Sequence, residues 1–305
     1  MSPALVITLK AFAYTALVLF ASPLLEGIIR KIKALIHSRM GPPITQPYLD
    51  LMKLLVKEDL ASENGMVARF APPAAFAAAL SAAFFVPFGV GAPAGGAGDL
   101  FLFIYLITLC SVFVMAGALA HASPYSHIGG SREMMMVLTV EAVVVISLLT
   151  VAVSGHTAIL SHLVGLTFKV SFILSLVCYL FAMQALLGKL PFDIPEAEQE
   201  IMGGPFIEYS GPSLALLKWT FYMKQLIFGS LFFNLFVGWP RVTAWGAGGS
   251  LLNFLISFVA VLLLGLFVVL VDATHPRLRI DQSLRFFAGL IVVALVAVGL
   301  AACGM

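Results

Sequence analysis

The chain has 305 residues, of which 61% are hydrophobic and only 10% are charged, and its formal net charge is +2. A soluble domain of this length cannot bury so much apolar surface, so the composition excludes a water-soluble protein and predicts an integral membrane protein. The small net charge gives no electrostatic support for a nucleic-acid partner.

Long apolar runs dominate the sequence from beginning to end. Each is about 20 residues long, enough for a helix to cross a hydrocarbon core of about 30 Å. The runs lack the alternation of barrel strands, and a helix satisfies its own backbone hydrogen bonds in lipid. We therefore predict an all-α, polytopic transmembrane helical bundle that forms one membrane domain over residues 1–305. The eight runs cover residues 5–25, 70–90, 100–121, 133–154, 170–188, 214–238, 252–271 and 284–303.

Charged residues gather in alternate gaps between these runs. Fourteen of the 17 Lys and Arg residues lie in or next to the gaps after runs one, three, five and seven. By the positive-inside rule, these gaps should face the cytoplasm of a prokaryotic cell and both termini should lie on the outer side of the cytoplasmic membrane.

The first charged gap, residues 26–69, is predicted to be an amphipathic surface segment. Gly41, Pro42 and Pro43 should break the helix that begins at Glu26, and a second helix should follow. In that helix an apolar stripe lies opposite the charged residues, as expected at a membrane surface. The stripe contains Tyr48, Leu51, Leu54 and Leu55. Both an interfacial anchor and a docking surface for a soluble partner fit this pattern, and the docking candidates are Arg39, Asp50, Lys53 and Lys57.

Two apolar runs carry charges into the membrane. In the fourth run, Glu133 and Glu141 lie on one helical face, the second roughly 12 Å further along the axis and close to the bilayer midplane. In the sixth run, Lys218 is near the boundary and can extend to it, whereas Lys224 lies about ten residues deep. A charge at such depth costs a few kcal/mol unless it is paired or lies on an ion route. Glu133, Glu141, Lys218 and Lys224 are therefore candidates for a charge relay.

The fifth gap, over residues 189–213, contains a cluster of acidic residues. Its five carboxylates, within sixteen residues, belong to Asp193, Glu196, Glu198, Glu200 and Glu208. Asp193 and Glu196 flank Pro195 as in a capping box, and the sequence from Gly203 to Pro205 should end a helix of about two turns. Like charges this close should raise each other's pKa, which favours a role in holding and passing protons. A solvated acidic loop is the alternative.

The seventh gap mixes both signs of charge. Asp272 can form a salt bridge with an arginine of the same gap, and the arginines of this gap can also form salt bridges with the carboxylates of the acidic segment. Together with Arg132, the residues Arg277, Arg279 and Asp281 are candidates for partner docking.

Cysteine and histidine show no metal or cofactor pattern. We interpret Cys110, Cys178 and Cys303, which lie within apolar runs, as small buried hydrophobic residues. The six histidines have no paired ligand spacing, so no metal, catalytic or cofactor-binding residue is predicted in this chain.

The order of these segments resembles a known family. The chain first contains the motif Arg-x-Gly-Pro, beginning at Arg39, and then Gln-Pro-x-x-Asp-x-x-Lys-Leu, beginning at Gln46. An intramembrane glutamate, Glu141, follows. The last motif is Pro-Phe-Asp-x-Pro-Glu-Ala-Glu-x-Glu, which begins at Pro191 and is followed by Glu-Tyr-Ser-Gly. This arrangement is similar to complex I subunit 1, which joins the peripheral and membrane arms, and to its relatives in group 4 nickel–iron hydrogenases and formate hydrogenlyase. The short stretch Pro43-Ile44-Thr45 and the phrase SREMMMVLTVE resemble the hydrogenase branch.

This resemblance implies a function. The chain would anchor a soluble nickel–iron hydrogenase module and couple its electron transfer to movement of H⁺ or Na⁺, without being catalytic by itself. The acidic loop and Glu141 would belong to a water-filled passage. The nickel–iron centre and iron–sulfur clusters would be held by partner subunits, namely the hydrogenase large and small subunits, while antiporter-like membrane subunits would move ions across the bilayer.

Three other functions remain open at this point. A quinone-site subunit of respiratory complex I would support quinone reduction by NADH. A stand-alone ion transporter would show inverted repeats, and we find no internal repeat. A structural scaffold would use its carboxylates only to dock basic partners.

Overall fold

The computed structural model describes residues 3–60, 65–88, 99–160, 163, 169–237 and 246–304. Within these residues the chain forms ten α-helices, a 3-10 turn and a π-helical turn. The elements are α1 (Pro3–Ile36), α2 (Gln46–Val56), α3 (Met66–Ala83), α4 (Leu100–Leu119), α5 (Pro124–Gly155), α6 (Val170–Leu186), α7 (Glu198–Ile201), η2 (Gly204–Phe206), α8 (Gly211–Phe232), η3 (Phe233–Val237), α9 (Gly246–Thr274) and α10 (Ile280–Ala302).

The apolar runs correspond to helices α1, α3, α4, α5, α6, α8, α9 and α10. Among the helices described, all of these except α6 are long and apolar enough to cross a membrane, which makes seven. Helix α6 has 17 residues, or a length of about 26 Å, and is the eighth apolar helix. The prediction of an all-α polytopic membrane protein is confirmed.

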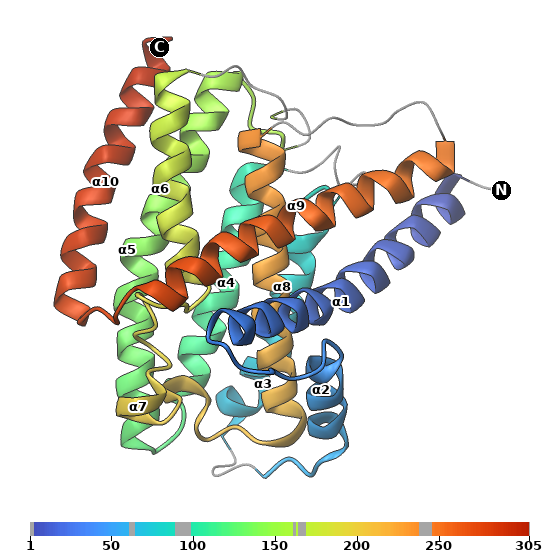
Figure 1. Ribbon diagram of the computed structural model, residues 1–305, viewed down its shortest axis with the longest axis vertical. Coiled ribbons are helices and arrows are strands. Elements are labelled where there is room, and N and C mark those ends of the chain that lie inside the picture. Colours follow the sequence, from blue (N-terminus) through green and yellow to red (C-terminus); the bar gives the residue numbers. More distant parts are fainter. Residues whose placement is uncertain are drawn as a thin grey trace.

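The helices form an upright bundle with two strongly inclined helices against one side. Helices α5, α6 and α10 stand together, α3, α4 and α8 form the middle, and α1 and α9 run obliquely next to each other (Figure 1). Helix α8 is the central element of the bundle, because 78% of its apolar 18-residue stretch is buried by other helices. Only 22% of the corresponding stretch of α10 is buried. The part of α8 that carries Lys224 therefore faces other helices, whereas Lys218 near its start is exposed.

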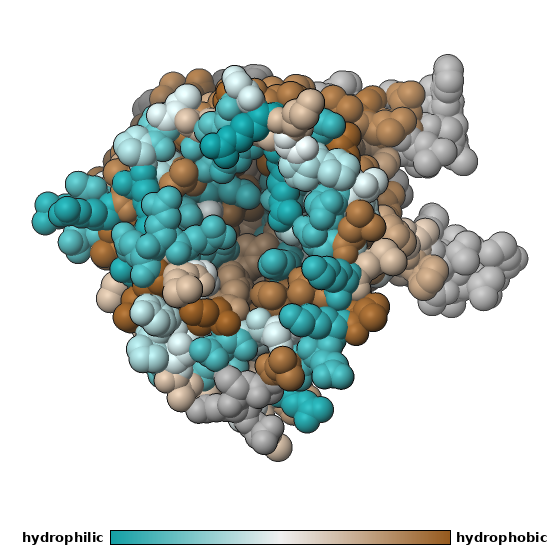
Figure 2. Space-filling model, turned by 60° about the horizontal axis from the view of Figure 1, so that its bottom comes forward, coloured by the Kyte–Doolittle hydropathy of each residue, from teal (hydrophilic) through white to brown (hydrophobic). Residues whose placement is uncertain are grey.

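One end of the bundle extends beyond a bilayer. Helix α5 has 32 residues, or about 48 Å, against a hydrocarbon core of about 30 Å. Its first turns lie at the same end as α2 and α7 (Figure 1). Hydrophilic side chains cover much of this end and surround a recess (Figure 2). We call it the polar end.

Helix α2 packs on α8 through one face. Leu51 is buried against Ala215 and Tyr222, and Leu54 packs beside it. Leu55, one turn after Leu51 and thus on the same side of the helix, is exposed. Packing on α8 therefore buries only part of the predicted apolar stripe. Residues 61–64 of the predicted surface segment lie outside the described part of the chain.

The acidic segment differs from its predicted form. Helix α7 is a single turn of four residues, its N-cap is Ala197 in a left-handed conformation, and no side chain caps it. The predicted capping box of Asp193 and Glu196 and the two-turn helix are therefore wrong. The glycines do end α7, since Gly203 and Gly204 have φ values of 96° and 48°.

A close contact between two glycines places the acidic segment against α5. A Cβ atom on Gly129 of α5 would lie 2.6 Å from the Gly204 Cα atom, closer than any side chain tolerates. The absence of a side chain at this position lets η2 lie directly on α5.

The cysteines are not all buried. Cys110 and Cys178 are buried as predicted, but Cys303 is exposed. The prediction for Cys303 is wrong because this residue follows α10, where the helix has ended.

Candidate functional site

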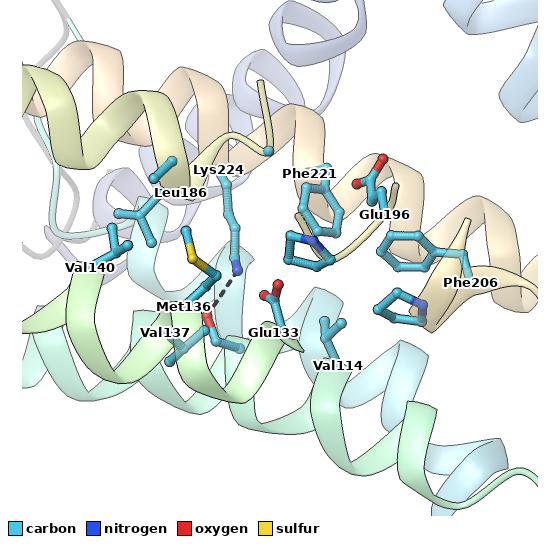
Figure 3. A pocket seen from close by; sticks show the side chains of 15 residues that line it. Val114, Glu133, Met136, Val137, Val140, Leu186, Glu196, Phe206, Phe221 and Lys224 are labelled. Atoms are coloured by element: carbon cyan, nitrogen blue, oxygen red, sulfur yellow. Dashed lines mark hydrogen bonds between the residues drawn. The ribbon is translucent and has the colours of Figure 1, made fainter. Parts of the chain in front are cut away.

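The candidate site is built around the buried lysine of α8. Lys224 is 3% exposed, and its Nζ atom donates a hydrogen bond to Ser111 Oγ of α4 at 3.1 Å. The Glu133 carboxylate of α5 points toward this ammonium group (Figure 3). A buried ammonium needs an opposite charge and hydrogen-bond acceptors, and Glu133 and Ser111 supply them.

A small cavity surrounds this group, and we call it the inner cavity. Its volume is about 30 Å³, room for about two water molecules. Most of its wall is apolar, and its polar lining residues are Ser111, Glu133, Glu196 and Lys224. Water held here would contact a carboxylate and an ammonium group together.

A second, larger cavity opens at the polar end, and we call it the outer cavity. Its volume is about 220 Å³, and its lining residues with charged side chains are Glu26, Arg30, Lys189, Glu196, Glu198 and Lys218. Lys218 and Glu198 are exposed at its rim. The sequence placed Lys218 near the boundary, and its exposure agrees with that.

Glu196 lies where the two cavities meet. Both cavities are lined by Gly188, Glu196, Phe206 and Phe221. The rings of Phe206 and Phe221 meet edge to face, with centroids 5.3 Å apart. The Glu196 carboxylate points away from Lys224 in Figure 3. A proton moving between the cavities would therefore pass this carboxylate beside two aromatic rings.

The carboxylates of the acidic segment do not behave as one group. Burial, together with the charge of Asp193 and against the charge of Lys189, raises the pKa of Glu196 to about 7. Burial also raises the pKa of Asp193, against the charge of Arg277. The pKa of Glu200 is instead lowered by its hydrogen bond from Arg132 and by Arg277. Repulsion between neighbouring carboxylates thus raises the pKa of Glu196 and Asp193 in the predicted direction, but burial is the larger cause at both, and at Glu200 the two arginines lower the pKa.

An ion-pair network that the sequence did not predict lines part of the outer cavity. Glu26 is buried and accepts from Arg30 Nε at 3.1 Å, with Lys189 Nζ 3.6 Å away. The charge of Glu26 is the main cause that raises the pKa of Lys189. Arg30 also donates to Tyr222 Oη at 2.9 Å. The i, i+4 spacing of Glu26 and Arg30 was the available signal in the sequence.

A second missed network ties the loop after α6 to α1 and α9. Asp272 is buried, forms an ion pair with Lys33, and accepts a hydrogen bond from the Leu190 N–H at 3.1 Å. The sequence predicted pairing for Asp272 within its own gap, but its partner Lys33 lies on α1. These contacts fix the start of the acidic segment.

Glu141 lies deeper on α5 than the inner cavity. Its Oε1 atom is buried and has no hydrogen-bond partner. Val137 and Val140 line the inner cavity, whereas Glu141 does not. Glu208 lines neither cavity. The structure thus brings Glu133, Glu196, Glu198, Lys218 and Lys224 together and leaves Glu141 and Glu208 outside.

The docking candidates divide into exposed and internally paired residues. Arg39, Lys53 and Lys57 are exposed at the polar end. Asp50 is turned inward, where it accepts from Gln46 at 2.9 Å and from Arg30 at 3.4 Å. Such internal bonds leave Asp50 less available to a partner.

The remaining docking candidates line a surface cavity. Arg132 and Arg277 pair with Glu200 at 2.8 Å and 3.4 Å. Arg279 and Asp281 lie in the same cavity wall. In the part of the chain described here, no group of three or more His, Cys, Asp or Glu residues is arranged to hold a metal ion.

The sequence is similar to membrane subunits of several redox complexes. It matches the family described as NADH dehydrogenase over residues 9–302. It is 36% identical to formate hydrogenlyase subunit 4 of Escherichia coli, covering 92% of this chain and 97% of that protein. It is 34% identical to hydrogenase-4 component C of Escherichia coli, covering 88% of each. With a subunit of the NADH-quinone oxidoreductase from Paramagnetospirillum magneticum the identity is 32%, covering 92% of this chain and 86% of that protein.

A solved structure shares the fold. A chain of the membrane-bound sulfane sulfur reductase, an archaeal respiratory membrane complex, superposes with a TM-score of 0.88 at 29% identity and covers 97% of this chain and 99% of that one. These relatives are components of multisubunit membrane complexes, so the present chain is a multi-pass prokaryotic membrane protein of that kind. From its helices, its acidic segment and these similarities, the chain belongs to the NADH dehydrogenase family of complex I subunit 1, in its hydrogenase branch.

Proposed function

We propose that this chain is the membrane subunit of an energy-converting hydrogenase complex. It anchors a soluble nickel–iron hydrogenase module, is not catalytic by itself, and couples electron transfer in that module to proton or sodium translocation. Similarity to formate hydrogenlyase subunit 4 and hydrogenase-4 component C supports the hydrogenase assignment.

The observation that carries the coupling role is the pair of cavities that meet at Glu196. One cavity opens at the polar end and the other contains the buried Lys224 with Glu133 beside it, and Glu196 lines both. In this proposal, charge that enters past the rim residues Glu198 and Lys218 passes Glu196 and changes the electrostatic balance around Lys224 and Glu133. Glu141 is the next carboxylate along α5, and its buried Oε1 atom has no hydrogen-bond partner in the described part of the chain.

The polar end is the docking surface for the soluble module. It faces the cytoplasm in this proposal, as the distribution of Lys and Arg predicts, and both termini lie on the outer side. The hydrogenase large and small subunits bind residues 26–69 and 189–213 and hold the nickel–iron centre and the iron–sulfur clusters. Antiporter-like membrane subunits receive the charge from this chain.

The inner cavity argues against a quinone site at Lys224. Its volume of about 30 Å³ accommodates water but not an aromatic head group. The hydrogenase assignment, which rests on similarity to formate hydrogenlyase subunit 4 and hydrogenase-4 component C, places the end of electron transfer on protons at the nickel–iron centre of the partner.

The test uses the whole complex, purified through a tag on this chain and reconstituted in vesicles. We expect a hydrogenase module to co-purify, and hydrogen evolution to drive ion uptake. The Glu141→Gln variant should evolve hydrogen with less ion uptake per hydrogen, whereas Lys169→Gln, before α6, should behave like the unaltered complex. An active preparation that lacks a hydrogenase module would contradict the anchoring role. An unchanged uptake ratio in Glu141→Gln would remove that residue from the relay.

A further inference from the structure

A surface cavity lies apart from the two cavities of the charge relay. Its volume is about 540 Å³, and its charged lining residues are Arg132, Glu200, Arg277, Arg279 and Asp281. The cavity forms where α9 ends and α10 begins, against α7 and the first half of α5. It lies beside the bundle and does not share lining residues with the inner or outer cavity.

The charges of this cavity leave donor capacity unused. Three guanidinium groups and two carboxylates line the cavity. Two of the guanidinium groups already have carboxylates beside them, because Glu200 accepts from Arg132 and pairs with Arg277 Nη1, and Asp193 also interacts electrostatically with Arg277. Arg279 is exposed in the same wall and takes part in neither Glu200 pair, so its guanidinium group is available to an acceptor.

The cavity lies at the level of a membrane surface. Helices α9 and α10 are both membrane spans, and they end and begin at Thr274 and Ile280. Residues 275–279 between them therefore lie near the lipid head groups. Arginines at this depth meet lipid phosphates.

The surface beside the cavity suits acyl chains. Helix α10 exposes most of its membrane-spanning stretch. Its exposed large hydrophobic residues are Phe286, Val292, Val293, Leu295 and Val296. A lipid whose head group enters the cavity would lay its chains along this helix.

We propose that this cavity binds the phosphodiester head group of an anionic phospholipid. The Arg279 guanidinium donates to the phosphate oxygens, Arg132 and Arg277 add positive charge beside it, and Glu200 holds the Arg132 and Arg277 side chains in place. The single negative charge of the phosphodiester is matched by the charge of Arg279. A zwitterionic head group would bring an additional ammonium group next to three guanidinium groups, so phosphatidylglycerol is preferred over phosphatidylethanolamine.

The test measures lipid binding to the purified, delipidated complex by native mass spectrometry. The probes are phosphatidylglycerol, phosphatidylethanolamine and inorganic phosphate. Arg279→Gln is the first variant, because this side chain is exposed and its loss leaves the Glu200 pairs intact. Arg277→Gln/Arg279→Gln is the second variant, and Lys169→Gln is the control for loss of one positive charge elsewhere.

We expect phosphatidylglycerol to bind more tightly than phosphatidylethanolamine, and inorganic phosphate not to compete at equal concentration. Arg279→Gln should weaken phosphatidylglycerol binding about tenfold, the order expected for one charge-assisted hydrogen bond, and the double variant should weaken it further. Lys169→Gln should leave binding within about twofold, less than the loss of one hydrogen bond.

Three results would overturn the proposal. Equal affinity for both lipids would show that the cavity does not select an anion. Competition by inorganic phosphate at the same concentration would identify free phosphate as the ligand. Loss of the soluble module from the arginine variants, with lipid binding unchanged, would show that the cavity receives an acidic group of a partner protein.

Discussion

Replacing Glu196 by Gln should change how the stability of the complex depends on pH. Burial raises the pKa of Glu196 to about 7 from an ordinary value of 4.5. Between these two values the folded chain holds a proton that the unfolded chain has released. Stability therefore falls as pH rises through this window, and the loss is complete above pH 7. The shift corresponds to about 3 kcal/mol.

The Glu196→Gln side chain stays neutral, so this loss should disappear. The assay is the temperature at which the purified complex is inactivated, measured from pH 5 to pH 8.5. The unaltered complex should become less stable across this range, and Glu196→Gln should show a flatter profile. In vesicles, the same variant should evolve hydrogen with less ion uptake per hydrogen, and Glu196→Asp should restore part of the uptake because it retains a carboxyl group.

Glu200→Gln is the matched control in the same segment. The hydrogen bond from Arg132 and the charge of Arg277 lower the pKa of Glu200, so the stability from these pairs is lost only as pH falls below the ordinary value of 4.5. Glu200→Gln should thus leave the slope between pH 5 and pH 8.5 unchanged. Equal slopes in the unaltered complex and in Glu196→Gln would refute the raised pKa of the Glu196 carboxyl group.

Two further predictions concern the buried pair and the glycine contact. Lys224→Met should destabilise the complex by about 2 kcal/mol, because Ser111 loses its charged hydrogen-bond partner and Glu133 loses a nearby opposite charge. Lys224→Met/Glu133→Gln should recover part of this stability without recovering ion uptake, and recovery of both would contradict a relay through these two residues. Gly129→Ala should lower the temperature at which the soluble module dissociates, because a new Cβ atom would meet Gly204 at a cost of about 1–3 kcal/mol. Gly289→Ala, on α10 with open space around its Cβ position, is the control, and an equal effect of both variants would show that the contact is unimportant.

The membrane architecture could be predicted because each helix is decided locally. A run such as residues 284–303 is apolar throughout, and lipid permits it only a hydrogen-bonded helix. The same reasoning identified Lys224 as a residue that needs a partner, since no other ionisable side chain of the sixth run lies as deep. The partner itself could not be predicted from the sequence, because Ser111 is 113 residues away along the chain and lies on another helix.

The shape of the acidic segment was harder to predict. Asp193, Pro195 and Glu196 have the order of a capping box, but the close contact between Gly129 and Gly204 and the hydrogen bond from Gly203 to the Glu196 carbonyl hold the chain in a loop. Tertiary contacts of this kind override local capping preferences.

The sequence by itself determined that this chain lies in a membrane, where its helices run and which gaps carry charge, because hydrophobic length and charge spacing act along the chain. Only the tertiary structure decided which carboxylate has a raised pKa and which has a lowered one. Glu196 and Glu200 are four residues apart, yet Glu196 lies between two cavities, whereas Glu200 contacts Arg132 of α5 and Arg277 of the connection between α9 and α10. A pKa depends on burial and on nearby charges in space, and the order of residues does not contain that information.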